Sequence, residues 1–325
     1  MASDSLQDQL VKYLTDAHSI EEQALQQMRA APDIAADDRL AQAFRQHLTE
    51  TEEQERLLRE RLGAAGARPS KVKDVVMRAG GVGFVLFARS QPDTAGKLTA
   101  HAYSYEHLEV ASYELLIRVA ERTGDTGTAG VARRIRDQER QMAERLESLF
   151  DVAVDASLRE LEPDDMEEQL VKYLADAHAI ENQSVQLLQR APDIGGEPEL
   201  QRVYTEHLQE TRDHLRLVEE RLAAHGSSLS KLKDAAMRLG ALNWGAFFQA
   251  QRDTPGKLAA FAFAFEHLEI AGYEQLRRVA ERAGDGETIE LARRILEQER
   301  TAASRLGSSF PLAASASLDA LGIRV

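Results

Sequence analysis

The sequence predicts an all-α protein built as two four-helix bundles in tandem, and three observations support this fold class. The chain repeats itself without a gap at an offset of 160 residues, so that residues 11–23, VKYLTDAHSIEEQ, align with residues 171–183, VKYLADAHAIENQ. Apolar residues recur at the spacing of amphipathic helices. The apolar–polar alternation typical of strands is missing from the sequence. Because solenoid repeats are only roughly 20–50 residues long, we expect each copy to form a core of its own.

The first helix of each copy is expected to start near the beginning of the repeat and to close at a proline. In copy one its apolar positions follow a helical period: Leu10, Val11, Leu14, Ala17, Ile20 and Leu25. Pro32 follows this stretch, and Pro192 takes the same position in copy two. Proline lacks a backbone donor and clashes with the preceding turn, so it predicts the end of the helix.

Three further helices are predicted in copy one. The second covers about residues 37–62 and stops at the glycines of residues 63–66. The third covers about residues 93–122 and ends at Thr-Gly-Asp, and the fourth covers about residues 126–150. Between the second and third helices we expect a short helix over residues 71–78, followed by a Gly-rich apolar segment.

The repeat sets the expected domain boundaries. Residues 1–152 form the first bundle, residues 153–165 the linker, and residues 166–320 the second bundle. The tail from Pro311 is rich in alanine and serine, so we expect it to be poorly ordered as far as Leu318.

Composition excludes several classes of function. A net charge of −14 is unfavourable for nucleic acid and for anionic lipid, whose phosphates require clustered lysine and arginine. The absence of cysteine excludes disulfides, zinc–thiolate sites and thiol redox chemistry. The apolar run over residues 80–88 is too short to span a bilayer, and the N-terminus has no secretory signal pattern. We therefore expect a cytoplasmic protein that acts on neither nucleic acid nor membranes.

Both copies keep a carboxylate in every predicted helix. The retained residues are Glu21, Glu50, Glu106, Glu109 and Glu139 in copy one and Glu181, Glu210, Glu266, Glu269 and Glu299 in copy two. Glu106 and Glu109 are three residues apart, so they share one face of the third helix. Four helices can thus direct carboxylates at a common centre.

Buried carboxylates are unfavourable unless they are protonated or paired with a cation. Divalent metal ions remove that penalty, and carboxylate cages in helical bundles hold pairs of iron or manganese ions. Two other interpretations remain open at this point. The glutamates can lie on solvated helix faces, or they can form a buried network with Arg118, Arg133 or Arg134.

The motifs resemble a known family. H-x-x-E-T in the second helix (His47 to Thr51), E-H-x-E-V-A-x-Y in the third (Glu106 to Tyr113) and E-R in the fourth are similar to the YciE/YciF group of stress-induced bacterial proteins. That group belongs to the ferritin-like superfamily, and the resemblance covers each repeat almost end to end. It implies two ferritin-like bundles, packed together as an internal pseudo-dimer, in a monomer or a small homo-oligomer.

The resemblance also implies a metal centre in each repeat. Two iron or manganese ions per repeat would be held by the ten retained glutamates. The usual E-x-x-H of ferritins is missing, because Glu53 and Asp213 stand three residues after Glu50 and Glu210. Histidines stand elsewhere, at His47, His107, His207 and His267, either as ligands or as partners that orient a carboxylate.

Other residues near the motifs can take part. Tyr113 and Tyr273 stand one turn beyond Glu109 and Glu269, where they either assist redox chemistry or simply bond a carboxylate. One difference between the copies concerns a metal-ligating residue type, since Gln54 of copy one becomes His214 in copy two. This change either adds a ligand to copy two only or is drift.

Three functions fit these patterns. The first is a di-metal protein of the bacterial stress response that reacts with O₂ or peroxide, as a ferroxidase or peroxidase does. The second is a scaffold that binds metal weakly or not at all. The third is a bundle whose metal ions only stabilise the core.

Overall fold

The computed structural model describes residues 5–69, 94–194, 196–227 and 254–323. The described residues form helices and contain no strand, which confirms the all-α fold. The chain divides into two compact units, unit 1 with Met1–Leu158 and Leu318–Val325 and unit 2 with Arg159–Ser317. Within the described ranges, no helix combines the length and the apolar character needed to cross a bilayer.

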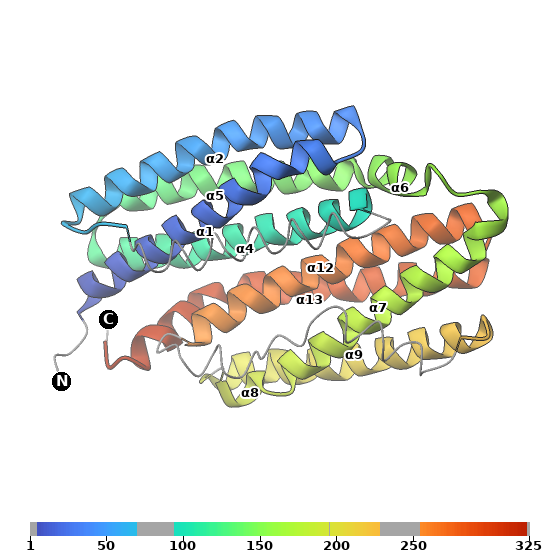
Figure 1. Ribbon diagram of the computed structural model, residues 1–325. Helices are drawn as coiled ribbons and strands as arrows, with labels where there is room; N and C mark the ends of the chain where they lie inside the picture. Colours follow the sequence, from blue (N-terminus) through green and yellow to red (C-terminus); the bar gives the residue numbers. More distant parts are fainter. Residues whose placement is uncertain (1–4, 70–93, 195, 228–253, 324–325) are drawn as a thin grey trace. The chain divides into compact units, whose positions relative to one another are not determined.

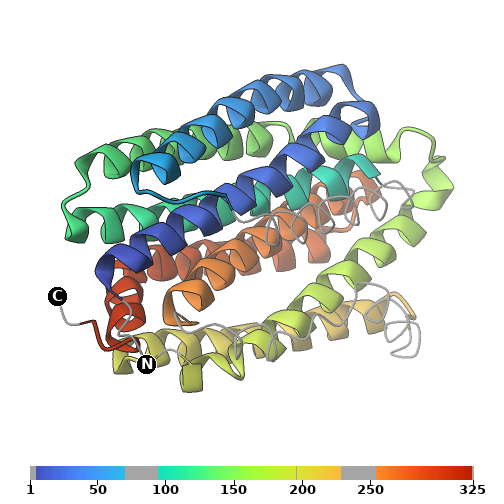
Figure 2. The same cartoon turned by 60° about the vertical axis from the view of Figure 1, so that its left-hand side comes forward.

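Unit 1 is a bundle of four long helices followed by a short one: α1 (Leu6–Ile34), α2 (Asp38–Ala64), α4 (Thr94–Thr123), α5 (Thr126–Ser148) and α6 (Phe150–Leu158). Helix α1 packs against α2 and α4, and α5 packs against α4 and α2, which closes the bundle. The four long helices run side by side in both views (Figures 1 and 2). The expected short helix over residues 71–78 and the apolar segment after it lie outside the described residues.

Polar residues at the helix ends fix where the helices begin. Ser5 and Asp8 form a capping box at the start of α1, and the side chain of Asp37 accepts a hydrogen bond from the backbone of Arg39 at the start of α2. Each cap satisfies a backbone donor that lacks a partner inside the helix. Gly124 has a φ of 75°, the left-handed conformation that ends α4 just before α5 starts.

One ion pair ties the end of α2 to the start of α5. Arg61 donates to both carboxylate oxygens of Asp125, at 2.8 and 3.0 Å, and Asp125 also caps α5 by accepting from the backbone of Thr128. Arg221 and Asp285 repeat this contact in unit 2. The two helices that carry His47 and Glu139 are thus held in one register.

Unit 2 repeats the arrangement with η1 (Pro163–Asp165), α7 (Met166–Leu188), α8 (Ala191–Ile194), α9 (Pro198–Ala224), α12 (Thr254–Ala283) and α13 (Gly286–Asp319). Helix α7 packs against α9 and α12. An ion pair of 2.6 Å between Arg300 and Glu274 joins α13 to α12, and the two helices lie side by side in Figures 1 and 2.

Three expected boundaries differ from the structure. Pro32 lies inside α1, because it stands in the last turn, where only one backbone hydrogen bond is lost. The first residues of the expected linker, 153–158, lie in α6, whose Phe150 and Val154 are buried. The tail after Pro311 is also helical, since α13 continues to Asp319 and buries Ala313 and Leu318.

The core of unit 1 is apolar in two parts and polar between them. Aliphatic and aromatic residues such as Leu14 and Phe44 fill one part of unit 1, and Leu58 and Leu62 fill another. Along the inner face of α2, the buried residues between Phe44 and Leu58 are polar. A polar layer is therefore enclosed between two apolar ones.

Candidate metal centre

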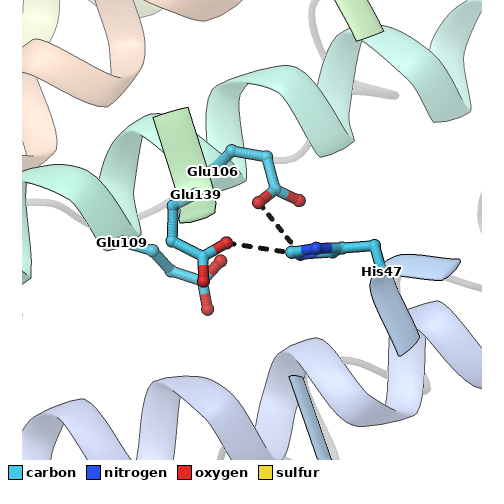
Figure 3. A group of neighbouring side chains, drawn as sticks. All are labelled: His47, Glu106, Glu109 and Glu139. Carbon is cyan, nitrogen blue, oxygen red and sulfur yellow. Dashed lines mark ion pairs between the residues drawn. The ribbon is translucent and has the colours of Figure 1, made fainter. Parts of the chain in front are cut away.

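In unit 1, three helices bring four metal-ligating side chains together. His47 comes from α2, Glu106 and Glu109 from α4, and Glu139 from α5. One ligand atom of each lies within 4.8 Å of all the others, and every side chain is buried. Figure 3 shows the carboxylates of Glu106 and Glu139 directed at the His47 ring, with the carboxylate of Glu109 beside that of Glu139.

The imidazole of His47 lies between two carboxylates. Its Nε2 atom is 3.1 Å from Oε2 of Glu106 and 3.3 Å from Oε2 of Glu139 (Figure 3). Its other nitrogen, Nδ1, is 3.1 Å from Oε2 of Glu50. Glu50 is 28% exposed at its side chain and therefore stands at the edge of the cluster, where it orients the His47 ring.

Helix α1 contributes a fifth carboxylate. Glu21 is fully buried and accepts a hydrogen bond from the phenol of Tyr113 through Oε1. Its Oε2 atom has no hydrogen-bond partner among the described residues. The charge of Glu21 also acts on Glu109, whose pKa it helps to raise. Tyr113 therefore holds the α1 carboxylate beside the cluster.

Unit 2 repeats this group. Four buried side chains again have ligand atoms within 4.8 Å of one another: His207, Glu266, Glu269 and Glu299. Nε2 of His207 is 2.7 Å from Oε2 of Glu266, and its Nδ1 is 3.2 Å from Oε2 of Glu210. Tyr273 donates to Oε1 of Glu181 as Tyr113 does to Glu21.

The two units differ beside this group. In unit 1 the amide nitrogen of Gln54 donates to Oε1 of Glu139. In unit 2 the corresponding residue is His214, whose Nδ1 lies 2.7 Å from Oε1 of Glu299 and 3.6 Å from Oε1 of Glu181. Glu181, His214 and Glu299 thus form a second buried group that shares Glu299 with the first.

Burial controls the protonation of the unit 1 cluster. It raises the pKa of Glu21 to about 8, and it raises the pKa values of Glu109 and Glu139 well above their usual range. Burial alone would lower the pKa of His47, but Glu106 and Glu139 raise it well above the ordinary value. Without a metal ion, the cluster therefore holds protons.

The carboxylates of unit 2 follow the same rule with one exception. Burial raises the pKa of Glu181 to about 8 and that of Glu266 to about 7, and it raises the pKa of Glu269 well above its usual range. Burial also disfavours ionised Glu299, but the contacts with His214 and His207 outweigh it and hold the pKa of Glu299 below its ordinary value.

The donors present fit a divalent cation. Both oxygens of Glu109 are buried without a hydrogen-bond partner among the described residues, and so is Oε1 of Glu269. Buried polar atoms normally have partners, so these oxygens indicate a missing positive ligand. Carboxylates suit manganese, and imidazole together with carboxylate suits iron. The buried histidine and glutamate clusters of both units can hold metal ions.

Two of the predicted histidines lie elsewhere. Nδ1 of His107 is 2.8 Å from the carbonyl oxygen of Tyr103, and Nδ1 of His267 is 2.7 Å from that of Phe263. Neither His107 nor His267 belongs to a group of metal-ligating atoms in the described residues. Each ring contacts the aromatic residue one turn earlier in a tilted arrangement, with centroids 4.5 and 4.4 Å apart.

The alternative glutamate–arginine network uses other carboxylates. Arg118 lies 3.6 Å from Glu114, and Arg133 donates to Glu121. Both pairs are partly exposed to solvent, so they contribute little to stability. The buried carboxylates Glu106 and Glu139 are instead paired with the imidazole of His47.

Among the described residues, a third kind of group occurs in unit 1 alone. His18, Glu22 and Glu55 have ligand atoms within 4.8 Å of one another and are buried. Nε2 of His18 is 2.8 Å from Oε1 of Glu55. In unit 2 the corresponding positions hold Asn182 and Leu215, so the repeat does not retain this group.

Position 54 of α2 faces inward, whereas the sequence singled it out only as a difference between Gln54 and His214. The buried residues of this face follow the spacing of a helix: Phe44, His47, Thr51, Gln54, Leu58 and Leu62. Phe44, Leu58 and Leu62 mark the apolar face of α2 in the sequence. The same helical spacing, continued through the polar residues between Phe44 and Leu58, places His47 and Gln54 on that inward face. The same extension would have placed Glu50 at the edge.

Comparison with known proteins supports the repeat. The family model described as "Domain of unknown function (DUF892)" matches residues 5–159 and again residues 165–317. No solved structure matches the chain.

Proposed function

The chain belongs to the DUF892 family, whose domain it contains twice, and from this premise we propose that each unit holds an iron or manganese centre that reacts with O₂ or peroxide. One observation carries the proposal. Both units enclose histidine and glutamate ligand atoms in a buried cluster, with carboxylate oxygens that lack hydrogen-bond partners among the described residues.

The protein side chains would prepare the site for a cation. Glu106, Glu109 and Glu139 supply carboxylates, and His47 supplies an imidazole nitrogen. Glu50 bonds the other ring nitrogen of His47 and fixes which nitrogen carries the proton. Since metal binding requires deprotonated ligands, loading would release the protons that burial retains.

The choice of iron or manganese and of an oxidant rests on the donors and on the resemblance to YciE/YciF stress proteins. These metals supply redox chemistry in a site that is shielded from water. Tyr113 and Tyr273 lie against the α1 and α7 carboxylates, where a phenol can exchange a proton with Glu21 or Glu181. A role in the bacterial stress response would follow from consumption of the oxidant.

The ion pairs that His47 makes without a metal ion favour a second candidate function. His47 carries a raised pKa between Glu106 and Glu139, so its imidazolium can compensate these carboxylates without any metal ion. The bundle would then be a scaffold with a buried ion network. A bundle with a purely structural metal ion is intermediate between the two candidates.

One experiment separates these functions. The protein is loaded anaerobically with Fe(II), the bound iron is counted, and O₂ uptake is then recorded. The double variant Glu109→Gln and Glu269→Gln is the control, since it keeps shape and burial. Iron binding with O₂ uptake, both lost in the variant, supports the proposal. Binding without uptake supports the structural metal ion, and no binding supports the scaffold.

A further inference from the structure

The two clusters differ in a single metal-ligating position. Their remaining residues are identical in type: Glu21, His47, Glu106, Glu109 and Glu139 match Glu181, His207, Glu266, Glu269 and Glu299. Position 54 is glutamine in unit 1, and the matching position 214 is histidine in unit 2. Both side chains are buried, with 0% and 1% of their surface exposed.

Glu299 has an imidazole near each of its oxygens. Its Oε1 atom is 2.7 Å from Nδ1 of His214, and its Oε2 atom is 3.7 Å from Nε2 of His207. Because each oxygen of Glu299 lies beside a different imidazole, this carboxylate can bridge two cations. In unit 1, Oε1 of Glu139 instead accepts the amide N–H of Gln54.

The ring of His214 is oriented for ligation through Nδ1. Its Nε2 atom lies 3.0 Å from Oε1 of Gln298, an amide oxygen that can only accept a hydrogen bond. This contact keeps one ring proton on Nε2, so the Nδ1 proton shared with Glu299 is the one that a cation would displace, and the Nδ1 lone pair would then face Glu181 and Glu299.

A second observation indicates a cation at this point. Glu181 is fully buried, and its Oε2 atom has no hydrogen-bond partner among the described residues. Only Oε1 of Glu181 is satisfied, by the phenol of Tyr273. Such an unpartnered oxygen is unfavourable unless another group supplies a positive charge.

We propose that Glu181, His214 and Glu299 form a second divalent-cation subsite that is complete only in unit 2, with Glu299 bridging it to the subsite of His207. This inference rests on the proposed metal centre of each unit. Unit 1 lacks an imidazole at this subsite: Gln54 turns its amide nitrogen, which cannot ligate a cation, toward Glu139, and its amide oxygen would suit iron less well than imidazole does. The two centres are therefore unequal, and unit 2 holds its second ion more tightly.

The test uses Co²⁺ as the probe, added anaerobically to the full metal-free chain. Tight binding steps are counted by calorimetry, and visible absorption reports the coordination of the bound ion. Three variants are compared with the original chain: His214→Gln, Gln54→His and the combined exchange. Because unit 1 carries glutamine at this position within the same fold, His214→Gln is expected to fold, and thermal unfolding of the metal-free protein checks this.

His214→Gln should remove one tight binding step from unit 2, with affinity at least about tenfold weaker. Gln54→His should add a step in unit 1, and the combined exchange should restore the original count. An unchanged count and affinity in both single variants would overturn the unequal subsites while leaving the metal centres standing. No Co²⁺ binding to the original chain would overturn the metal centres, and this inference with them.

Discussion

The carboxylate of Glu50 lies 3.1 Å from Nδ1 of His47, on the nitrogen that faces away from the buried carboxylates. Glu210 and His207 repeat the contact at 3.2 Å in unit 2. A carboxylate at this position fixes the ring and makes its other nitrogen a better donor. The partly exposed Glu50 of α2 thus acts through His47 beside it.

Removing the glutamate that orients each histidine should weaken metal binding without abolishing it. We expect Glu50→Gln combined with Glu210→Gln to lower metal affinity by about 10–100-fold, the usual effect of losing a group that orients a ligand. Calorimetric titration with Mn²⁺ measures the effect. Glu53→Gln is the control, because Glu53 is partly exposed and its ion pairs among the described residues are with Arg56. An unchanged affinity in the double variant would contradict the orienting role.

The stability of the metal-free protein should fall as pH rises. A glutamate has an ordinary pKa of about 4.3, whereas Glu21 and Glu181 have pKa values of about 8 and Glu266 about 7. Their raised folded-state pKa values stabilise the fold fully below the unfolded value, and this contribution is lost as pH rises through about 7 to 8. Thermal unfolding between pH 5 and pH 9 checks the direction. A transition temperature that rises over this range would contradict the burial of protonated carboxyl groups.

Metal ions should restore the stability that the metal-free protein loses as pH rises. A cation that binds only the folded state at 100 times its Kd stabilises it by about 2.7 kcal/mol. For domains of this size, each kcal/mol raises the transition temperature by about 2–4 °C. We expect the largest rise on adding Mn²⁺ at pH 8, where the ligands lose their protons most readily. The same rise with Glu109→Gln and Glu269→Gln would place the bound ion somewhere else.

The phenol of Tyr113 should matter for the carboxylate that it bonds. Burial raises the pKa of Glu21 and the Tyr113 hydrogen bond lowers it, so Tyr113→Phe should raise it further and weaken metal binding at pH 7. Leaving Oε1 of Glu21 unpartnered should also cost about 1–3 kcal/mol of metal-free stability.

The matched control for Tyr113→Phe is Tyr105→Phe. The phenol of Tyr105 donates to the carbonyl oxygen of Ile20 at 3.0 Å, so its loss removes a partly buried hydrogen bond that does not involve the Glu21 carboxylate. We expect a loss of stability with unchanged metal affinity. If both variants bind metal like the original chain, Tyr113 serves packing alone.

The repeat made much of the fold predictable from the sequence. The helical period of residues such as Leu10 and Leu14 predicted α1, and the retained Glu106–Glu109 pair predicted which face of α4 turns inward. Both signals are local, since they depend on 3.6 residues per turn and on nothing else in the fold.

What the sequence left open was the rotation of α2 about its own axis. His47 and Glu50 are almost one turn apart, so either can face the centre, and the outcome depends on the packing of Phe44 and Leu58 against other helices. The continuation of α13 past Pro311 also depends on packing. Burial of Ala313 and Leu318 stabilises helix beyond the proline, which local propensity alone does not predict.

The central claim is that the two buried clusters bind metal, and the most direct measurement is metal content per chain. Protein purified from iron- and manganese-supplemented cells is analysed by plasma mass spectrometry, beside the Glu109→Gln and Glu269→Gln double variant purified in the same way. The account predicts two or more ions per chain in the original protein and their loss in the variant. An original chain that contains no metal, and takes up none as Fe(II) without oxygen, would contradict it.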